Sequence, residues 1–151
     1  MNNLIYEWGA LMARIIAIAN QKGGVGKTTT AVNLSACLAV KNKKVLVIDI
    51  DPQGNTTSGL GVDKNTIKNS IYDTIINEMP IEDTLIETQI KGLHLSPSNI
   101  NLAGAEVELV SVFSRETRLK NALEDVNDKY DFIIIDCPPS LGLLTINSLT
   151  A

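Results

Sequence analysis

Four short apolar runs recur along the chain, each bounded by glycine, proline or other polar residues. They lie at Arg14–Ala19, Val45–Ile50, Leu93–Ser96 and Phe132–Asp136. Nearly continuous apolar runs of this length are typical of parallel strands that are buried on both faces of a sheet. The pattern therefore predicts a sheet whose strands run mainly parallel to one another.

Segments with helical spacing of apolar residues lie between and after these runs. They are Thr28–Lys41, Ser70–Asn77, Asn101–Asn127 and Leu141–Ala151. Strands that alternate with helices are the signature of an α/β layered fold, in which helices flank a mainly parallel sheet. We therefore expect the first strand, the helix after it and the second strand to form a βαβ unit.

The remaining segments show weaker patterns. Asp51–Asn69 is rich in Gly, Asn, Thr and Asp and has little periodicity, so it is predicted to be a long functional loop. Ser70 followed by Asp73 resembles a capped helix start. Ile81–Thr84 is predicted to form a turn before a short strand, and Ser111–Ser114 to break the helical segment around it.

Length and composition are those of one folded domain. The chain has 151 residues, of which 44% are hydrophobic and 20% charged, enough for a sizeable core and unlike a disordered chain. Its net charge is −4. An acidic balance argues against strong nucleic-acid binding by this segment alone, because that affinity comes from basic residues. No apolar run approaches the roughly 20 residues that span a bilayer.

The two cysteines do not form a recognisable metal or disulfide motif. Cys37 and Cys137 are far apart and lack CxxC or Cys/His spacing, which is typical of a reduced, cytosolic protein. Cys37 lies within a predicted helix, so we expect it to be a buried structural thiol.

Residues 1–11 precede a second methionine, Met12, after which the chain reads as a natural domain start. The first segment could be a short added helix, a membrane-surface anchor or an upstream mis-start. It has no basic residue, whereas an anchor usually has several. We therefore interpret residues 1–11 as a disordered or wrongly started extension and residues 12–151 as the domain.

The segment from Asn20 to Thr30, NQKGGVGKTTT, carries the strongest chemical signal. Its glycines lead into a lysine and threonines, between a predicted strand and a predicted helix. Such a loop directs backbone N–H groups and a helix N-terminus at a polyphosphate. Lys27 would reach the β- and γ-phosphates, and the Thr28 hydroxyl would ligate Mg²⁺. The usual phosphate-loop pattern requires glycine where this chain has Gln21, and Lys22 is an additional lysine.

Three aspartates lie at the ends of predicted strands. Asp49 and Asp51 follow the second strand, and Asp136 ends the run FIIID. Ligands of open α/β sheets bind at the carboxyl ends of the strands. An acid that closes an apolar strand is costly unless it is paired or close to a metal, and an aspartate in this place commonly holds Mg²⁺.

KGGVGKT, DIDPQGNTTSGLG, SPSNINLAGAEVEL and YDFIIIDCPPSLGLLTIN together resemble the ParA/Soj-type partition ATPases, which have a deviant Walker A loop and are relatives of MinD. The resemblance covers nearly all of residues 12–151. It implies a P-loop NTPase-type fold that binds ATP and Mg²⁺. The loop residues that it assigns to the nucleotide are Gly23, Gly24, Val25, Gly26, Lys27, Thr28 and Thr29.

The same resemblance assigns further roles. Lys22 would reach the nucleotide of a second subunit, Asp51 would orient the attacking water, and Asp49 with Asp136 would help hold Mg²⁺. The segments 51–57 and 136–140 would be the two switch segments that respond to the γ-phosphate. Together with Lys27, these residues imply slow hydrolysis that is coupled to an ATP-dependent homodimer.

Partners and alternatives also follow from the resemblance. It implies a ParB-type centromere-binding protein, non-specific nucleoid DNA, and a cytoplasmic, nucleoid-associated protein that needs no membrane. Family members run to roughly 250 residues, so we expect this chain to be the N-terminal part, without the C-terminal DNA surface. A MinD-like membrane-cycling switch, or an inactive fragment that retains partial nucleotide binding, stays open as an alternative.

Overall fold

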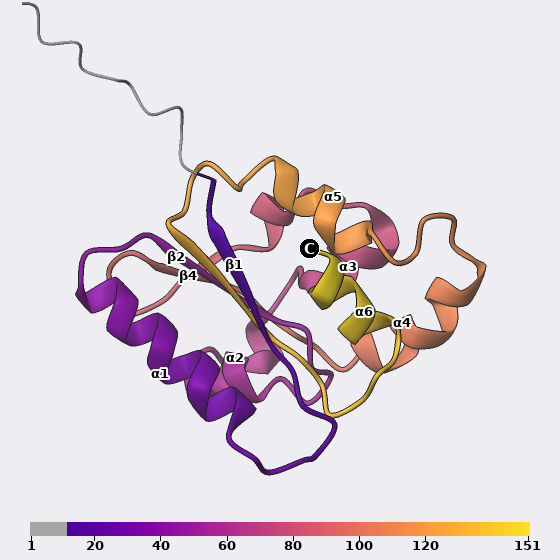
Figure 1. Ribbon diagram of the computed structural model, residues 1–151, viewed down its shortest axis with the longest axis horizontal. Helices are drawn as coiled ribbons and strands as arrows, with labels where there is room; N and C mark the ends of the chain where they lie inside the picture. Colours follow the sequence, from indigo (N-terminus) through magenta and orange to yellow (C-terminus); the bar gives the residue numbers. More distant parts are fainter. Residues whose placement is uncertain (1–11) are drawn as a thin grey trace, which may run out of the picture.

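The computed structural model describes residues 12–151 as a sheet with helices on both faces (Figure 1). The segment 1–11, interpreted above as an extension, lies outside the described residues. The strands are β1 (Arg14–Ile18), β2 (Val45–Asp49), β3 (Ile86–Glu87), β4 (Leu93–Ser96) and β5 (Phe132–Asp136). The α-helices are α1 (Lys27–Val40), α2 (Asn55–Gly59), α3 (Ile71–Asn77), α4 (Leu102–Glu108), α5 (Arg118–Glu124) and α6 (Leu143–Thr150). Short 3-10 helices are η1 (Lys64–Thr66), η2 (Ile81–Thr84) and η3 (Leu109–Ser111).

The five strands form one sheet in the order β1-β5-β2-β4-β3. Every pairing is parallel except that between β3 and β4, so the predicted mainly parallel α/β fold is confirmed. The strands β2 and β5 are central and almost wholly buried, as their unbroken apolar sequences require. Because β5 pairs with both β1 and β2, Asp136 lies level with Ile18 and with Asp49.

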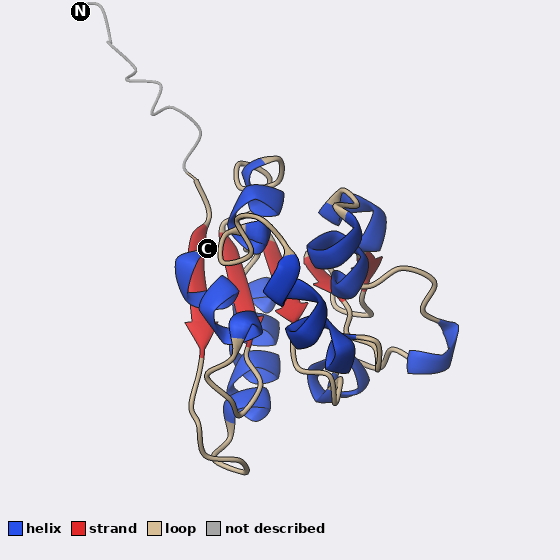
Figure 2. Cartoon of the chain, turned by 90° about the vertical axis from the view of Figure 1, so that its right-hand side faces the viewer, coloured by secondary structure: helices blue, strands red, loops and turns tan. Residues whose placement is uncertain are grey.

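Two apolar layers cover the sheet. On one face, α1 packs over Val45, Val47, Leu95 and Ile134. On the other face, α3, α4, α5 and α6 pack over side chains that include Leu46, Ile48, Ile133 and Ile135. Figure 2 shows helices on both sides of the strands. Successive side chains of β2 and β5 therefore pack into opposite apolar layers. Because both faces of these strands are buried, their sequences do not alternate between apolar and polar residues.

The prediction of a loop over residues 51–69 is wrong in part, because this segment contains α2 and η1. Thr56 and Thr57 of α2 are buried and make side-chain hydrogen bonds to aspartates of β5 and β2. The helix is thus held by polar contacts and has no apolar stripe. Hydrophobic periodicity, on which the loop prediction rested, cannot detect such a helix.

The other predicted helices are confirmed within a few residues of their bounds. Ser70 and Asp73 form the expected capping box at the start of α3. The break near residues 111–114 separates η3 from α5, and Ser114 has a positive φ of 53° there. The prediction for Cys37 is wrong: this thiol is exposed, because α1 buries Ala31, Ser35 and Ala39 on its opposite side.

Candidate functional site

The glycine-rich loop joins β1 to α1 at the carboxyl end of the sheet (Figure 1). Gly24 and Gly26 have φ values of 69° and 90°, in the left-handed region that residues with a side chain rarely adopt. Apart from the adjoining residues of the chain, no atom of residues 12–151 lies within 4 Å of a Cβ built on Gly23, Gly24 or Gly26. The loop therefore borders open space, as a cradle for a ligand must.

The helix α1 starts at Lys27, directly after this loop. Its N-cap is Gly26, and no side chain caps the first turn. The N–H groups at this end are thus available, and the helix dipole adds partial positive charge. This arrangement is a site for an anionic group such as a phosphate.

Asp136 lies beside the start of α1, and its carboxylate accepts hydrogen bonds from two hydroxyl groups. Its Oδ2 accepts hydrogen bonds from Thr28 Oγ1 at 2.8 Å and from Thr56 Oγ1 at 2.7 Å. Burial raises the pKa of Asp136, and the bonds from Thr56 and Thr28 oppose that effect. The carboxylate thereby joins β5, the phosphate loop and α2.

The second oxygen of Asp136 is the atom that points to a cation. Oδ1 is buried and has no hydrogen-bond partner among residues 12–151. A buried carboxylate oxygen without a partner is costly. Carboxylate and hydroxyl oxygens are hard ligands of the kind that Mg²⁺ prefers, directly or through water. Asp136 and Thr28 therefore fit a magnesium ion bound beside the phosphate loop.

Asp49 is fully buried and bonded to protein groups. Its Oδ2 accepts hydrogen bonds from the N and Oγ1 of Thr57, both at 2.7 Å, and its Oδ1 accepts one from the Asp51 N at 3.3 Å. Burial raises the pKa of Asp49 to about 7, against the opposing bonds from Thr57. These bonds attach α2 to β2, and the metal role of Asp49 stays a prediction.

Asp51 follows β2 and is held in a tight turn. Its Oδ1 accepts a hydrogen bond from the Gln53 N at 2.9 Å, and its carbonyl oxygen accepts one from Ser98 Oγ at 2.5 Å. The Ser98 N donates to Thr57 Oγ1 at 3.0 Å. The segment after β4 thus supports the residues after β2. The role of Asp51 toward a water molecule stays a prediction.

The two lysines of the loop differ in their surroundings. Lys27 is half-buried at the start of α1, and its charge opposes the rise in the pKa of Asp136. Lys22 is exposed, and its backbone N donates to Asn20 Oδ1 at 2.9 Å. Residues 19–22 line a hollow of about 510 Å³ together with Ser140 and Leu141. The loop after β5 therefore forms the opposite wall of the space next to Lys22.

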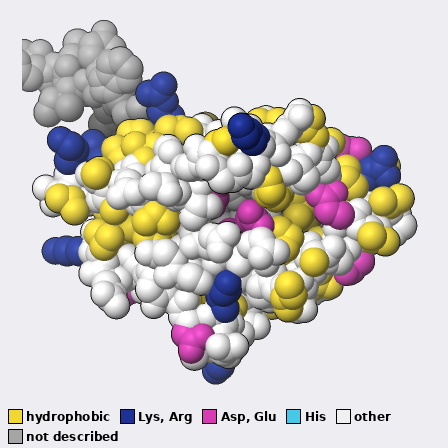
Figure 3. Space-filling view, turned by 90° about the horizontal axis from the view of Figure 1, so that it is seen from below, with side chains coloured by type: hydrophobic (Ala, Val, Ile, Leu, Met, Phe, Trp, Pro, Cys, Tyr) yellow, Lys and Arg dark blue, Asp and Glu magenta, His cyan; other side chains and the backbone are white. Residues whose placement is uncertain are grey.

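Val25 and Thr29 complete the set of predicted loop residues. Val25 is 44% exposed, and Thr29 is exposed in the first turn of α1. The structure brings Thr28 to Asp136 and places both loop lysines at the same end of the sheet. Seen from that end, the molecule has scattered charges and an acidic spot set back near the middle of the face (Figure 3).

Sequence reasoning included Thr56 and Thr57 in a switch segment but gave no individual role to them or to Ser98, and all three shape this site. Each is buried, and their hydroxyls bond to Asp136, to Asp49 and to the Asp51 carbonyl oxygen respectively. A signal was available, since NTTSG and SPSN are polar segments that directly follow the ends of strands or lie close to them. Their partners are distant in sequence, so periodicity could not identify them.

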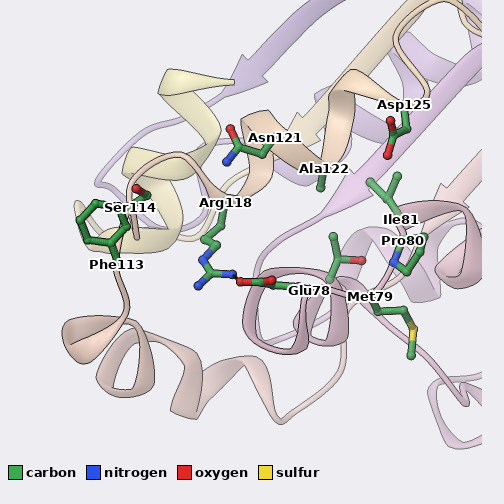
Figure 4. Close-up of a pocket in the computed structure, with 11 residues that line it drawn as sticks. Glu78, Met79, Pro80, Ile81, Phe113, Ser114, Arg118, Asn121, Ala122 and Asp125 are labelled. Carbon is green, nitrogen blue, oxygen red and sulfur yellow. Dashed lines mark hydrogen bonds and ion pairs between the residues drawn. The ribbon is translucent and has the colours of Figure 1, made fainter.

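A second hollow, of about 500 Å³, lies between α3 and α5 (Figure 4). Arg118 reaches across it and pairs with Glu78, which ends α3. None of the residues that line this hollow belongs to the predicted site. We therefore assign the Arg118–Glu78 pair to the contact between these helices.

Within residues 12–151, no group of three or more His, Cys, Asp or Glu residues could hold a metal ion. No helix in that part of the chain is long and apolar enough to cross a membrane.

The fold and the loop define the class: a parallel sheet with a glycine-rich phosphate loop between β1 and α1 is the architecture of P-loop NTPases. Residues 13–151 match the family model described as AAA domain, and the chain belongs to that family.

Two curated relatives are named for chromosome partitioning or sporulation. The chain is 60% identical over 140 residues to the sporulation initiation inhibitor protein Soj of Bacillus subtilis, covering 93% of this chain and 55% of that protein. It is 53% identical over 142 residues to the chromosome partitioning protein ParA of Myxococcus xanthus, covering 94% and 50%. The chain spans about half the length of the curated relatives it matches.

Solved structures show the same architecture. A cobyrinic acid a,c-diamide synthase from Mycobacterium smegmatis with bound ADP and magnesium has a TM-score of 0.89 at 45% identity, covering 93% of this chain and 57% of that one. A plasmid partition protein from Borrelia burgdorferi bound to AMPPNP has a TM-score of 0.81 at 35% identity, covering 93% and 60%. Nucleotide and magnesium binding thus occur among proteins of this fold.

Proposed function

We propose that the chain is the nucleotide-binding part of a ParA/Soj-type partition ATPase, a switch that binds and slowly hydrolyses Mg-ATP. The observation that carries the proposal is Asp136, which holds Thr28 on one oxygen and has a buried, unpartnered oxygen beside the phosphate loop. The partition function is favoured because the ParA relative, which is named for chromosome partitioning, is 53% identical, whereas the similar diamide synthase structure is 45% identical.

Different residues of the chain would bind the phosphates, hold Mg²⁺ and orient the attacking water. The N–H groups of residues 23–29 and the start of α1 bind the phosphates, and Lys27 offsets the charge of the β- and γ-phosphates. Thr28 and Asp136 hold Mg²⁺, which when bound neutralises charge that develops on the phosphate oxygens. Asp51 orients the attacking water, and Asp49 helps to place the metal's water shell.

Lys22 would couple nucleotide binding to the association of two copies of the chain. It is exposed at the entrance of the phosphate loop, where it can reach a nucleotide held by a second copy of the chain. ATP would then favour a homodimer, and hydrolysis would dissolve it. For the whole protein we propose the partners that the resemblance to partition ATPases implies, namely a ParB-type centromere-binding protein and nucleoid DNA, in the cytoplasm.

The test is a thermal melt of the chain with and without Mg-ATP, for wild type, Lys27→Ala and Lys43→Ala. Lys43 is exposed beyond the far end of α1, so it is the matched control. Ligand at about 100 times its dissociation constant should add roughly 2.7 kcal/mol of stability. We expect Mg-ATP to raise the melting temperature of wild type and Lys43→Ala but not that of Lys27→Ala. A wild type that does not respond to Mg-ATP contradicts the proposal.

A further inference from the structure

The helix α6 begins without a cap from its own sequence. Its N-cap is Gly142, and no side chain of that segment bonds to the first turn. A side chain from α4 does so instead: Glu106 Oε2 accepts a hydrogen bond from the Leu143 N at 2.8 Å, and Oε1 accepts one from the Leu144 N at 3.2 Å. A carboxylate at a helix N-terminus is favoured by the free N–H groups and by the dipole.

Gly142 makes this contact possible. A Cβ at position 142 would overlap the Glu106 carboxylate, at distances far inside van der Waals contact with both oxygens and with the carboxyl carbon. Gly142 has an extended backbone, so glycine is not required there for its φ. The space for the carboxylate of Glu106 is what requires a residue without a side chain.

The capped helix start also fixes one wall of the hollow beside the phosphate loop. Thr145 in the first turn of α6 donates from Oγ1 to the Ser140 carbonyl oxygen at 2.8 Å. Ser140 and Leu141 line the same hollow as Lys22. A shift of the α6 N-terminus would therefore move Ser140 and Leu141 relative to the phosphate loop.

We infer that Glu106 is a positioning residue that, through the first turn of α6, holds the 136–142 segment in its place opposite the phosphate loop, and thereby sets how strongly the site prefers ATP to ADP. The inference rests on the proposed function. Glu106 lies on α4, which contributes no predicted ligand of the nucleotide. Because the γ-phosphate is the group that the 136–140 segment is expected to sense, a loosened segment should weaken ATP binding more than ADP binding.

The experiment compares dissociation constants for Mg-ATP and Mg-ADP by calorimetry in wild type, Glu106→Gln, Gly142→Ala and Glu108→Gln. Glu108 is the matched control, since it lies on the same helix and its carboxylate accepts a hydrogen bond from the Tyr72 hydroxyl and none from α6. We expect Glu106→Gln and Gly142→Ala to lower the ratio of ATP to ADP affinity about tenfold, the effect of one charge-assisted hydrogen-bonded contact. Affinity for ADP should stay within about twofold, and Glu108→Gln should match wild type.

A second readout needs no nucleotide. Amide hydrogen exchange at Leu143 and Leu144 should be faster in Glu106→Gln and Gly142→Ala and unchanged in Glu108→Gln. Unchanged exchange in both variants would contradict the claim that Glu106 caps the first turn of α6. Because Gly142→Ala alters the partner and not the carboxylate, it tests the same contact even if Glu106→Gln folds poorly.

The outcomes separate this inference from the proposed function. A wild type that binds neither nucleotide contradicts the proposed function, and the inference falls with it. A wild type that prefers ATP, with the same preference in Glu106→Gln and Gly142→Ala, overturns the inference alone. Equal weakening of ATP and ADP binding, with a lower melting temperature, also overturns it, because that is the result of a purely structural cap.

Discussion

Asp136 holds the hydroxyls of Thr28 and Thr56 on one carboxylate oxygen and has no partner on the other. The unpartnered oxygen is buried, which costs about 1–3 kcal/mol of desolvation that a cation or its water would relieve. The two threonines orient the carboxylate, in the way that groups around a metal ligand generally do. Thr56 should therefore affect metal binding although it is not predicted to touch the metal.

Replacing Thr56 by Val removes the hydroxyl and keeps the shape of the side chain. We expect the Mg²⁺ concentration needed for ATP-dependent stabilisation to rise about 10–100-fold, the usual effect of losing a group that orients a metal ligand. The measurement is a set of thermal melts at fixed ATP over a range of Mg²⁺. Thr30→Val is the control, since Thr30 is exposed in the first turn of α1. Equal Mg²⁺ requirements in the two variants would contradict the role of Thr56.

The pKa of Asp49 makes a prediction about pH. Burial raises this pKa from 3.8 to about 7 in the folded chain. The folded state therefore holds a proton that the unfolded state has already lost between these pH values. The contribution of Asp49 to stability is full below about pH 4 and is lost as the pH rises to about 7.

We expect Asp49→Asn to remove this part of the pH dependence. Between about pH 5.5 and 7.5, the free energy of unfolding of wild type should fall by about 2 kcal/mol more than that of Asp49→Asn. Urea denaturation at both pH values, without nucleotide or Mg²⁺, measures the difference. The same pH dependence in both proteins would mean that the Asp49 carboxyl titrates normally.

At the residue scale, the sequence predicted the phosphate loop and Asp136 because their signals are local. Gly24 and Gly26 lie in a continuous motif, and Asp136 interrupts an apolar strand. Thr56 and Ser98 depend on partners 80 and 47 positions away in sequence. Such bonds are set by the packing of strands and become visible only in three dimensions.

At the scale of elements, α3 shows how a local sequence determines the start of a helix. The Ser70 N donates to Asp73 Oδ2 at 2.9 Å, and the two residues form a capping box. Ser70 is also buried, so its hydroxyl has few alternatives to this contact. The pair was predictable because a capping box spans four consecutive residues.

Ser70→Ala should therefore destabilise the chain by about 1 kcal/mol. The expected signature is a lower urea midpoint with an unchanged m-value, because the surface exposed on unfolding does not change. Ser111→Ala is the control. Ser111 is exposed at the end of η3, and its substitution should stay within about 0.5 kcal/mol of wild type. A cost for Ser70→Ala no larger than that control would show that the box adds no stability.

The elements that were predicted well are those with an apolar pattern, namely the four parallel strands and α1. The helix α2 was missed because hydrogen bonds of Thr56 and Thr57 hold it in place. The same distinction applies to α6: its apolar residues predicted a helix, but its cap comes from Glu106, which is 37 positions from Leu143.

At the scale of the whole molecule, the sheet order could not be read from the sequence. β5 is the last strand of the described chain, yet it lies between β1 and β2. This insertion brings Asp136 next to the phosphate loop and to Asp49. Apolar runs predict strands but not their neighbours, so the site could be predicted as a set of residues and not as an arrangement.

The apolar surface of residues 12–151 predicts self-association. Within residues 12–151, β1 is an edge strand that pairs only with β5, and Ala13, Ile15 and Ala17 pack on the same face of the sheet as Leu144 of α6. Leu149 of α6 is 61% exposed. Exposed apolar side chains and a strand edge without a second partner in the described part of the chain both favour contacts between copies.

Leu149→Lys should weaken this association severalfold, because a charge would have to be buried in the contact. Sedimentation velocity over a range of protein concentrations measures it. Val40→Lys is the matched control, since Val40 is 74% exposed at the far end of α1 and the change in charge is the same. If both variants associate alike, net charge and not the α6 face controls the contact.

The exposure of Cys37 and the burial of Cys137 have a practical consequence. A maleimide dye would attach without any engineered cysteine to the outer side of α1, the helix that follows the phosphate loop. Burial raises the pKa of the Cys137 thiol, which further slows its alkylation. Because Cys137 directly follows Asp136, each slow second modification would count an opening of the segment after β5. The sequence therefore already contains a labelling position for fluorescence, Cys37. It also contains a second cysteine, Cys137, whose rate of modification reports how often that segment opens.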